Sequence, residues 1–306
     1  MDARRLGLIS TRLHYFQVVA QTGSSRRAAH LLNVAPSAIS RSIIQLEQDL
    51  GAPLFERIRQ RLRLTSAGEI LVYHARITQS ELTKASALID DLKGLRRGSI
   101  VIAAAESVAR GLFPQLMSGF WERFPNVTVD VRVMGSRQAM EAVGDGECDL
   151  ALAFDFRGLK KTVTQLASAS VGIGALVRPD HPLARRNNVR LRDFAGERVL
   201  LSDASLTLGE SIEEAMRDLL VASPPRARTN SISVMTALAV HGCGVAFQTR
   251  VGVETELARG DLVFLPLRDP QLRPRKLILA ARSRGHLPRA SAALAEMLTK
   301  ALDRQD

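Results

Sequence analysis

The sequence of 306 residues predicts an α/β protein in which a small helical domain with a two-stranded hairpin is followed by a long helix and a larger α/β domain. Three observations support this order. Residues 24–68 contain two short helical patterns around a tight turn, followed by an alternating arginine-rich segment. Residues 65–94 repeat mostly apolar positions at the spacing of a paired helix. Beyond residue 98, short apolar strands alternate with helical segments, which is typical of a mostly parallel sheet.

The first helical segment is short and has clear end signals. It begins at Ser24 or Ser25, because a serine hydroxyl can accept a hydrogen bond from the free backbone amides of a first turn. Asn33 is expected to end it. We expect four apolar residues on its inward face: Ala28, Ala29, Leu31 and Leu32.

A second helix is predicted from Pro36 to Gly51. Proline suits the first helical position, since its missing N–H would have no partner there, and glycine suits the position just after a helix end. The expected apolar face is Ile39, Ile43, Leu46 and Leu50. The other face is polar or basic: Ser37, Ser40, Arg41, Gln45 and Gln48. Such a helix pair is typical of a recognition helix that enters the major groove of DNA, and a surface helix pair without a ligand is the alternative.

Residues 57–64 read RIRQRLRL, with arginine at the four odd positions and an apolar residue at positions 58, 62 and 64. This alternation predicts strands, and a turn near residues 59–61 would make them a hairpin wing. Arginine suits phosphate because its planar guanidinium can donate two hydrogen bonds at once. Four arginines alone are usually a solvated edge, but after a helix-turn-helix pattern they are better interpreted as contacts to the DNA backbone or minor groove.

The N-terminal segment, mainly residues 24–68, resembles the N-terminal domain of the LysR-type bacterial transcriptional regulators. The residues that match in order and spacing are Phe16, Gly23, Ser24, Ala28, Ala29, Leu32, Ser37, Ala38, Ser40, Ile43, Leu46, Glu47, Leu50, Gly51, Leu54, Phe55, Arg57, Leu64, Thr65 and Gly68. One departure is Ala35, where the family usually has Ser or Thr capping the recognition helix. Losing such a cap typically costs about 1 kcal/mol and also removes a phosphate or base contact. Pro36 and packing are then expected to hold the helix start.

The helix and hairpin patterns, together with the resemblance, imply a set of DNA contacts. Ser37, Ser40 and Arg41 are expected to reach bases, whereas the wing arginines are expected to meet mostly phosphate. The full set is Ser24, Arg26, Arg27, Pro36, Ser37, Ser40, Arg41, Gln45, Arg57, Arg59, Arg61 and Arg63.

The positive charge is concentrated near the N-terminus. Residues 1–97 carry 15 Lys and Arg against 8 Asp and Glu, whereas residues 98–306 carry 27 against 23. The net charge of +11 is therefore interpreted mainly as a nucleic-acid footprint. A membrane surface is the weaker explanation, because the basic residues do not lie on one amphipathic helix.

Several classes of protein are not expected from this sequence. The first ten residues lack the apolar stretch of a secretory signal, and no segment approaches the roughly 20 apolar residues of a membrane span, so a cytoplasmic protein without membrane contact is predicted. Cys148 and Cys243 lie in apolar sequence and are expected to be reduced, with a redox switch as the lesser alternative. His241 and Cys243 have no further ligand at metal-binding spacing, so neither a metal nor a cofactor is expected.

A long helix is predicted from about Thr65 to Gly94. Ser66 and Glu69 have the spacing of a capping box, whereas the family resemblance places Thr65 at the cap. The predicted seam of this helix, which repeats over three heptads, is Leu71, Ala75, Thr78, Leu82, Ala85, Ile89 and Leu92. Such a seam favours a two-stranded coiled coil and hence a homodimer or a tetramer made of two dimers, and a helix packed only on its own domain is the alternative.

Residues 92–99 are expected to form a hinge before the larger domain. Strands are predicted at residues 100–105, 127–133, 149–154, 172–177, 198–201, 245–248, 262–266 and 276–281, and helices at 111–124 and 137–144. This region resembles the two-lobed effector domain of the same family, which is similar to periplasmic solute-binding proteins. The resemblance implies a winged helix-turn-helix domain at residues 1–66, a linker helix and hinge at 67–97 and an effector domain at 98–306, with lobe I at about 98–170 plus 274–306 and lobe II at about 171–273.

Ligands of parallel sheets bind beyond the carboxyl ends of the strands, where helix N-termini also present free amides. Together with the resemblance, this predicts an effector site between the lobes formed by Glu106, Ser107, Val108, Gly135, Ser136, Phe154, Ser202, Asp203, Asn230 and Phe247. The alternative for each residue is a helix cap or loop without a ligand role. Glu106, with Asp155 and Asp203, argues against a simple aromatic carboxylate as the effector. Phe247-Gln248, where the family usually has Leu-Pro, is a second departure.

These features predict a sequence-specific transcriptional regulator whose oligomer responds to a small molecule. Its expected partners are double-stranded promoter DNA, further copies of the chain, RNA polymerase and an unidentified effector. Two alternatives are a DNA-binding regulator that senses no small molecule and a two-lobed transferase. The enzyme is the weaker one, because the sequence has no glycine-rich phosphate loop, no nucleophile elbow and only six scattered histidines.

Overall fold

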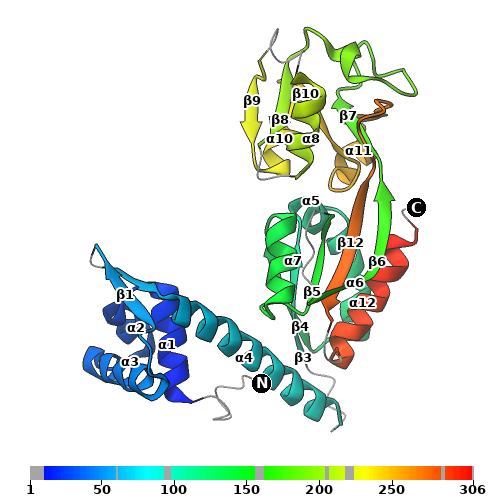
Figure 1. Ribbon diagram of the computed structural model, residues 1–306. Coiled ribbons are helices and arrows are strands. Elements are labelled where there is room, and N and C mark those ends of the chain that lie inside the picture. Colours follow the sequence, from blue (N-terminus) through cyan, green and yellow to red (C-terminus); the bar gives the residue numbers. More distant parts are fainter. Residues whose placement is uncertain are drawn as a thin grey trace. The chain divides into compact units, whose positions relative to one another are not determined.

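The computed structural model describes residues 10–59, 61–92, 98–155, 162–203, 207–217, 224–283 and 287–304 (Figure 1). The chain forms two compact units, one mainly from the first 95 residues and the other mainly from residue 96 onward. None of the helices within the described ranges is both long and apolar enough to cross a membrane.

The first unit packs helices and a hairpin around one apolar core. Its elements are α1 (Thr11–Thr22), α2 (Ser25–Leu32), α3 (Pro36–Leu50), β1 (Phe55–Ile58), β2 (Arg61–Leu64) and the long helix α4 (Ser66–Leu92). The core is centred on Phe16, Ile39 and Leu54, whose side chains are buried. The predicted winged helix-turn-helix is confirmed, since the antiparallel pair of β1 and β2 directly follows α2 and α3.

The terminal residues of α2 and α3 determine where these helices begin and end. The Ser24 hydroxyl accepts a hydrogen bond from the Arg27 amide at 3.4 Å. Asn33 ends α2 with a φ of +52°, a left-handed conformation that asparagine tolerates better than most residues. Ala35 makes no side-chain cap at the start of α3, and Pro36 occupies the first turn, both as predicted.

Two residues of the predicted apolar faces are exposed instead. Leu31 is 67% exposed, because it lies about 110° around α2 from the direction in which Ala28 and Ala29 face the core. Leu50 is 51% exposed, because it is the last residue of α3, where none of the described elements covers it. The prediction that these two leucines face the core was therefore wrong, although other residues of the two predicted faces are buried.

The hairpin places its arginines on two faces. Ile58 lies opposite Arg61, and Arg57 lies opposite Leu62. Because directly opposed residues of an antiparallel pair share a face, Arg61 and Arg63 lie on the face of Ile58, whereas Arg57 lies on the other face. The turn therefore interrupts the alternation that the odd-numbered arginines suggested.

Hydrogen bonds from distant residues hold the hairpin against the helices. The Glu47 carboxylate on α3 accepts hydrogen bonds from the backbone amides of Leu54 at 2.7 Å and Phe55 at 3.2 Å. The Leu62 amide donates to the Gly23 carbonyl at 3.0 Å. The recognition helix and the wing are thus fixed relative to each other by backbone groups as well as by the apolar core.

The long helix α4 begins at the cap that the family resemblance indicated. The Thr65 hydroxyl accepts a hydrogen bond from the Gly68 amide at 3.1 Å. Of the predicted seam, Leu71 packs against the core of the first unit, so it serves its own domain. Farther along α4, Ile89 is 52% exposed, and the side chain of Leu92 lies outside the described residues.

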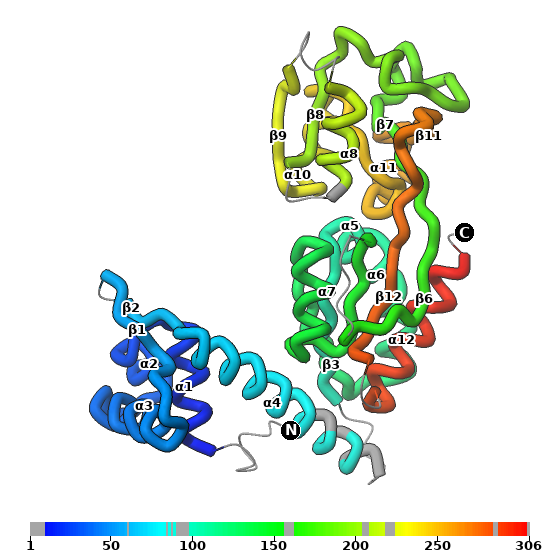
Figure 2. The backbone as a smooth tube through the Cα atoms, in the orientation of Figure 1, coloured from blue at the N-terminus to red at the C-terminus, as the bar shows by residue number. Residues whose placement is uncertain are grey.

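The second unit contains two five-stranded sheets, and the chain crosses between them twice (Figures 1 and 2). Lobe I, with strand order β4-β3-β5-β12-β6, consists of β3 (Gly98–Ala104), α5 (Glu106–Arg110), α6 (Leu112–Arg123), β4 (Val127–Val133), α7 (Ser136–Gly144), β5 (Leu150–Phe154), β6 (Val163–Val171), β12 (Arg275–Arg282) and α12 (Arg289–Leu302). Lobe II, with strand order β11-β7-β10-β8-β9, consists of β7 (Ile173–Val177), η1 (Leu191–Phe194), β8 (Val199–Ser202), α8 (Thr207–Ala215), β9 (Ala227–Thr229), α10 (Ile232–Val240), β10 (Val245–Thr249), α11 (Glu254–Arg259) and β11 (Val263–Pro266).

Both sheets are mixed, whereas the sequence predicted a mostly parallel arrangement. In lobe I, β4, β3 and β5 run parallel, but β12 is antiparallel to β5 and β6. In lobe II, β10, β8 and β9 run parallel, but β7 is antiparallel to β10 and β11. The antiparallel pairs involve the strands that enter or leave a lobe at the two crossings, so the direction of the crossing chain sets their polarity.

The predicted elements occur with small shifts, and several others were missed. Each predicted strand, and each of the two predicted helices, begins and ends within two residues of an observed one. The strands β6 and β9 and the helices α5, α8, α10, α11 and α12 were not predicted. The helix α10 is apolar at nearly every position, so it shows no helical periodicity, and β9 is only three residues long.

We expect Ala35→Thr to stabilise the first turn of α3, because a threonine hydroxyl can accept a hydrogen bond from the amides there. Relative to Ala35→Val, which has a similar shape but no acceptor, the expected gain in the free energy of unfolding is about 1 kcal/mol. Hydrogen exchange of the first-turn amides of α3, measured in both variants of the full chain, tests this. Equal protection in the two variants would show that an acceptor at residue 35 adds nothing.

Candidate functional site

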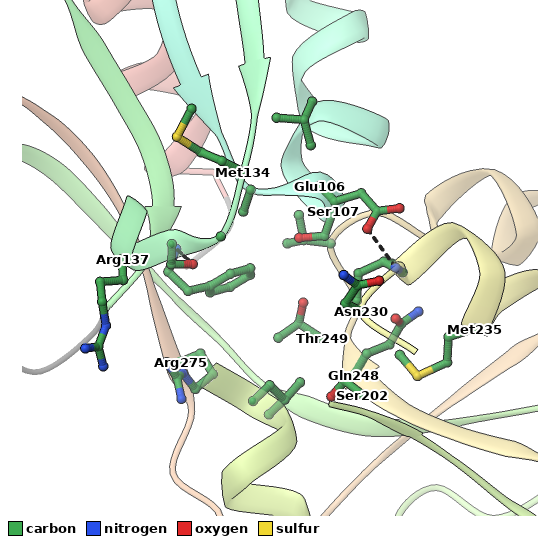
Figure 3. Close-up of a pocket in the computed structure, with 18 of the residues that line it drawn as sticks. Glu106, Ser107, Met134, Arg137, Ser202, Asn230, Met235, Gln248, Thr249 and Arg275 are labelled. Atoms are coloured by element: carbon green, nitrogen blue, oxygen red, sulfur yellow. Dashed lines mark hydrogen bonds between the residues drawn. The ribbon is translucent and has the colours of Figure 1, made fainter. Parts of the chain in front are cut away.

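A cavity of about 620 Å³ lies between lobe I and lobe II (Figure 3). Lobe I contributes the residues that follow β3 and β4, together with the last residue of β5. Lobe II contributes the last residues of β8 and β10 and the residue after β9. These strands run parallel within each lobe, so their carboxyl ends meet at the cavity, which is where ligands of such sheets bind.

The residues predicted for an effector site are largely brought together here. Those that line the cavity are Glu106, Ser107, Gly135, Ser136, Phe154, Ser202, Asn230 and Phe247. Val108 does not line it, because its side chain is completely buried in the core of lobe I. Asp203 does not line it either. Its backbone amide donates to the Thr229 carbonyl at 3.1 Å and prolongs the pairing of β8 with β9.

Other lining residues were not predicted from the sequence, among them Met134, Arg137, Met235, Gln248, Thr249 and Arg275. Gln248 carried a visible signal, since it is a polar residue near the end of an apolar strand. Met235 carried none, because α10 was not predicted. Arg275 also carried none, because only the crossing from lobe II brings β12 to the cavity.

Glu106 joins the two lobes at the cavity. It is the first residue of α5 in lobe I, and its carboxylate accepts hydrogen bonds from the first turn of α10 in lobe II (Figure 3). The donors are the Ser231 hydroxyl at 2.9 Å, the Ile232 amide at 2.8 Å and the Ser233 amide at 3.0 Å. The carboxylate therefore occupies the positive N-terminal end of α10.

These hydrogen bonds control the charge of Glu106. Burial raises its pKa, but the amides of Ser233 and Ile232 and the Ser231 hydroxyl outweigh that effect, so the pKa lies below the ordinary glutamate value. The side chain is thus ionised at neutral pH, and its oxygens are already occupied. An anionic ligand group at this helix end would meet the carboxylate of Glu106, because the amides there are no longer free.

An ion pair and a close approach of the backbone also connect the lobes beside Glu106. The Arg110 guanidinium on α5 forms an ion pair with the Glu256 carboxylate on α11, and both side chains are largely shielded from solvent. Gly252, just before α11, has a φ of +92°, and a Cβ added to it would lie 2.7 Å from the Ser107 Cα. Because this conformation and this close approach both require the absence of a side chain, glycine fixes how near α5 can come.

Asp155, expected as a further acid in the cleft, is engaged elsewhere. Arg275 Nη2 donates to the Asp155 carbonyl at 2.6 Å, and Arg275 Nε lies 3.3 Å from the Asp155 carboxylate. Asp155 and Asp203 are both absent from the lining, so only Glu106 of the three acids expected at the cleft lines the cavity. The charged lining residues are balanced in sign: Glu106, Glu210, Arg137 and Arg275.

The first unit presents polar and basic side chains on the surface predicted to contact DNA. Those exposed on α3 and the wing are Pro36, Ser37, Ser40, Arg41, Gln45, Arg57, Arg59, Arg61 and Arg63. Arg26 and Arg27 on α2 are exposed as well. Ser24 instead caps α2, and Gln45 donates to the Asp49 carboxylate at 2.9 Å, so these two residues already have partners within the chain.

Comparison with known families decides between the remaining interpretations. Residues 10–69 match the model of the bacterial regulatory helix-turn-helix protein of the lysR family, and residues 93–303 match that of the LysR substrate binding domain. The chain belongs to the LysR family. This confirms the resemblance seen in the sequence and makes the protein a LysR-type DNA-binding transcriptional regulator with an effector-binding domain.

Individual LysR-family relatives align along most of the chain. The probable RuBisCO transcriptional regulator of Synechocystis sp. is 26% identical over 287 residues, which is 92% of this chain and 83% of that protein. A full-length OxyR variant from Pseudomonas aeruginosa has a TM-score of 0.67 at 21% identity, covering 95% of this chain and 93% of its own. CbnR, solved with its target DNA, has a TM-score of 0.63 at 19% identity, covering 95% and 98%. At these identities the solved structures establish the LysR fold.

We expect Glu106→Gln to weaken the contact between the lobes by about 1 kcal/mol at pH 7, the typical loss for a helix cap. The depressed pKa means that the contribution of the carboxylate is complete above the ordinary glutamate pKa of 4.5 and is lost as the pH falls through the lower folded value. Urea unfolding at pH 7 and at successively lower pH measures the difference from the unmodified LysR-family chain.

Glu122→Gln, at an exposed glutamate of α6, is the matched control and should behave like the unmodified chain at every pH. A loss from Glu106→Gln that stays constant down to the acid limit would contradict an electrostatic cap.

Proposed function

We propose that this LysR-family regulator binds promoter DNA as a dimer or a tetramer and that a small effector, bound between lobes I and II, controls this binding. The proposal assigns DNA binding to residues 1–66, subunit pairing to residues 67–97 and effector binding to residues 98–306. Within the last region, lobe I spans about 98–170 plus 274–306 and lobe II about 171–273. The observation that carries it is the interlobe cavity in a chain whose other unit exposes a basic recognition helix and wing.

The assignment of base contacts rests on which face of α3 is buried. Ile39 and Ile43 face the core, whereas Ser37, Ser40 and Arg41 are exposed. The N-terminal half of the second helix in a helix-turn-helix is the part that reaches base edges in the major groove. We therefore assign these three side chains to bases, with Arg26, Arg27, Pro36 and Gln45 beside them.

The assignment of backbone contacts rests on the two faces of the wing. Arg61 and Arg63 share one face, but Glu56 lies directly opposite Arg63 and offsets part of its charge. Arg61 is consequently the wing cation that we expect to contribute most to phosphate binding. Arg57 lies on the other face, and Arg59 lies at the turn, where each can reach a different part of the backbone.

Subunit pairing through α4 is supported by apolar side chains left at its surface. Leu88 is 37% exposed and Ile89 is 52% exposed, and both lie near the C-terminal end of this helix. Pairing with a second copy would bury them. A two-fold dimer presents two recognition helices, so the operator is expected to contain an inverted repeat with half-sites one helical turn, or a multiple of it, apart.

Effector control is supported by the size and position of the cavity. Its volume of about 620 Å³ is within the range of small-molecule sites, and residues of both lobes line it. A ligand that favours one arrangement of the lobes shifts the population toward it. The altered oligomer then changes DNA bending and contact with RNA polymerase in the cytoplasm. The proposal includes no catalytic step and no cofactor, in keeping with a family of transcriptional regulators.

We expect Arg41→Ala and Arg61→Ala to weaken DNA binding in different ways. Losing Arg41 removes a base contact, which costs about 1–3 kcal/mol on an operator and reduces the preference over scrambled DNA. Losing Arg61 removes a phosphate contact, so all sequences bind more weakly and the salt slope falls by about one unit. Gel-shift titrations at several salt concentrations, on an operator selected from random DNA by the chain itself, measure both effects.

Arg259→Ala, at an exposed arginine of α11, removes the same charge from the effector-binding unit and serves as the control. Equal loss of specificity in Arg41→Ala and Arg61→Ala would contradict the division of roles. A loss in Arg259→Ala as large as that in Arg61→Ala would show that net charge, and not the wing, is responsible.

We expect some members of a panel of small metabolites to raise the melting temperature of the chain, because a ligand of the native state stabilises it by about 2.7 kcal/mol at 100 times its Kd. Asn230→Trp, which fills the cavity from an exposed lining position, should abolish these shifts. Differential scanning fluorimetry at millimolar ligand provides the measurement. A regulator that senses nothing would melt at one temperature with every compound.

A further inference from the structure

We propose that the ligand of the interlobe cavity is an uncharged molecule with a small apolar body and a hydroxyl or amide group, and that this group binds the side-chain amide of Gln248. The inference rests on the proposed effector function and adds the chemical class of the effector. It is carried by the partners of Gln248, by the polar groups around it and by the position of the charges.

Gln248 is a buried polar side chain in a mostly apolar strand. It lies in β10, whose sequence VAFQT is otherwise mostly apolar, and it is only 2% exposed while lining the cavity. Its Nε2 donates to the Thr236 hydroxyl at 3.3 Å. Its Oε1 is buried and has no hydrogen-bond partner among the residues that the structure describes.

An unpaired buried amide oxygen is costly, because it has given up water without gaining a partner. Figure 3 shows Gln248 among the side chains that surround the cavity, so a group inside the cavity is in a position to supply that partner. A hydroxyl or a carboxamide fits this role, since each donates a hydrogen bond without carrying a charge.

The other buried polar groups of the cavity are also uncharged. The hydroxyls of Ser107, Ser202 and Thr249 line it, and each of these residues is less than 7% exposed. Together with Gln248 they can exchange hydrogen bonds with a neutral polar molecule. They offer no countercharge to an ion.

The charged lining residues are neutralised or peripheral. Glu106 is bonded to the first turn of α10, and Arg275 is paired with Asp155. Arg137 and Glu210 are exposed. An ionised ligand group placed deep in the cavity would therefore lose its hydration without meeting a free opposite charge, which is strongly unfavourable.

The apolar lining residues favour a ligand whose main part is apolar. Met235 is buried on the lobe II side, and Phe154 lies on the lobe I side. Aromatic and thioether side chains of this kind pack well against a ring or a short branched chain. The cavity thus combines an apolar body site with a neutral hydrogen-bonding end.

Four matched probes test this ligand class: benzyl alcohol, benzamide, benzoate and toluene. Binding to the full chain is measured by ligand-observed NMR titration at millimolar concentration, for the unmodified chain, Gln248→Leu and the control Gln115→Leu, at an exposed glutamine of α6. We expect benzyl alcohol and benzamide to bind about tenfold more tightly than toluene and benzoate. In Gln248→Leu alone, they should lose the advantage over toluene, which comes from the hydrogen bond, and keep the advantage over benzoate, which comes from the absence of a charge.

The melting temperature without ligand separates this role from a structural one. Because Gln248 leaves a buried oxygen unpaired and the Thr236 hydroxyl can turn to a carbonyl of its own helix, Gln248→Leu should melt at the same temperature as the unmodified chain or higher. A clear drop would mean that Gln248 serves the fold, and it would overturn the proposal.

The proposal also fails if benzoate binds as tightly as benzyl alcohol, if the neutral probes bind Gln248→Leu and the unmodified chain equally, or if none of the four binds. None of these results decides whether the cavity binds an effector at all, because the metabolite panel with Asn230→Trp tests that separately. A wrong ligand class can therefore be distinguished from a wrong proposed function.

Discussion

The hydrogen bonds that Glu106 accepts from the first turn of α10 are the interaction on which the interlobe cavity depends. The chain crosses between the lobes twice, so the noncovalent contacts of α5 decide how closely the lobes approach on its side. Glu106 combines several of these contacts in one group, because one charge meets three donors and a helix N-terminus together. The same carboxylate sets the electrostatic character of the cavity, since it occupies the helix end that would otherwise attract an anion. Geometry and ligand preference therefore have a common origin in one side chain.

The first unit uses the same device on a smaller scale. Glu47 on α3 accepts the amides of Leu54 and Phe55, and the Gly23 carbonyl accepts the Leu62 amide, so backbone groups of the hairpin bond to residues of the preceding helices. Without such partners the hairpin would be an isolated two-stranded ribbon, which is marginally stable in water. The recognition helix and the wing are thus held as one rigid surface, and this rigidity lets phosphate contacts fix the register in which bases are read.

The sequence predicted what depends on near neighbours. The ends of α2 and α3 at Ser24, Asn33 and Gly51 follow from the conformational preferences of single residues, and the strand positions follow from short apolar runs. What failed depends on contacts between distant segments. The direction of β12 and the presence of Arg275 at the cavity are set by the crossing from lobe II, and α10 was missed because it is apolar all round. Most cavity residues at strand ends could be predicted, since strand polarity brings those ends together.

The wing shows how a register, and not a composition, can determine a charged surface. Its turn between β1 and β2 includes Arg59 with a φ of +46°, and it sets Ile58 opposite Arg61. One residue more or less in that turn would move Arg61 to the face of Arg57 while every arginine stayed in the chain. Because the same shift would turn Leu62 and Leu64 away from the core of the first unit, the length of this turn is constrained by packing, and evolution can change the DNA-backbone footprint by an insertion or deletion there only at a loss of stability.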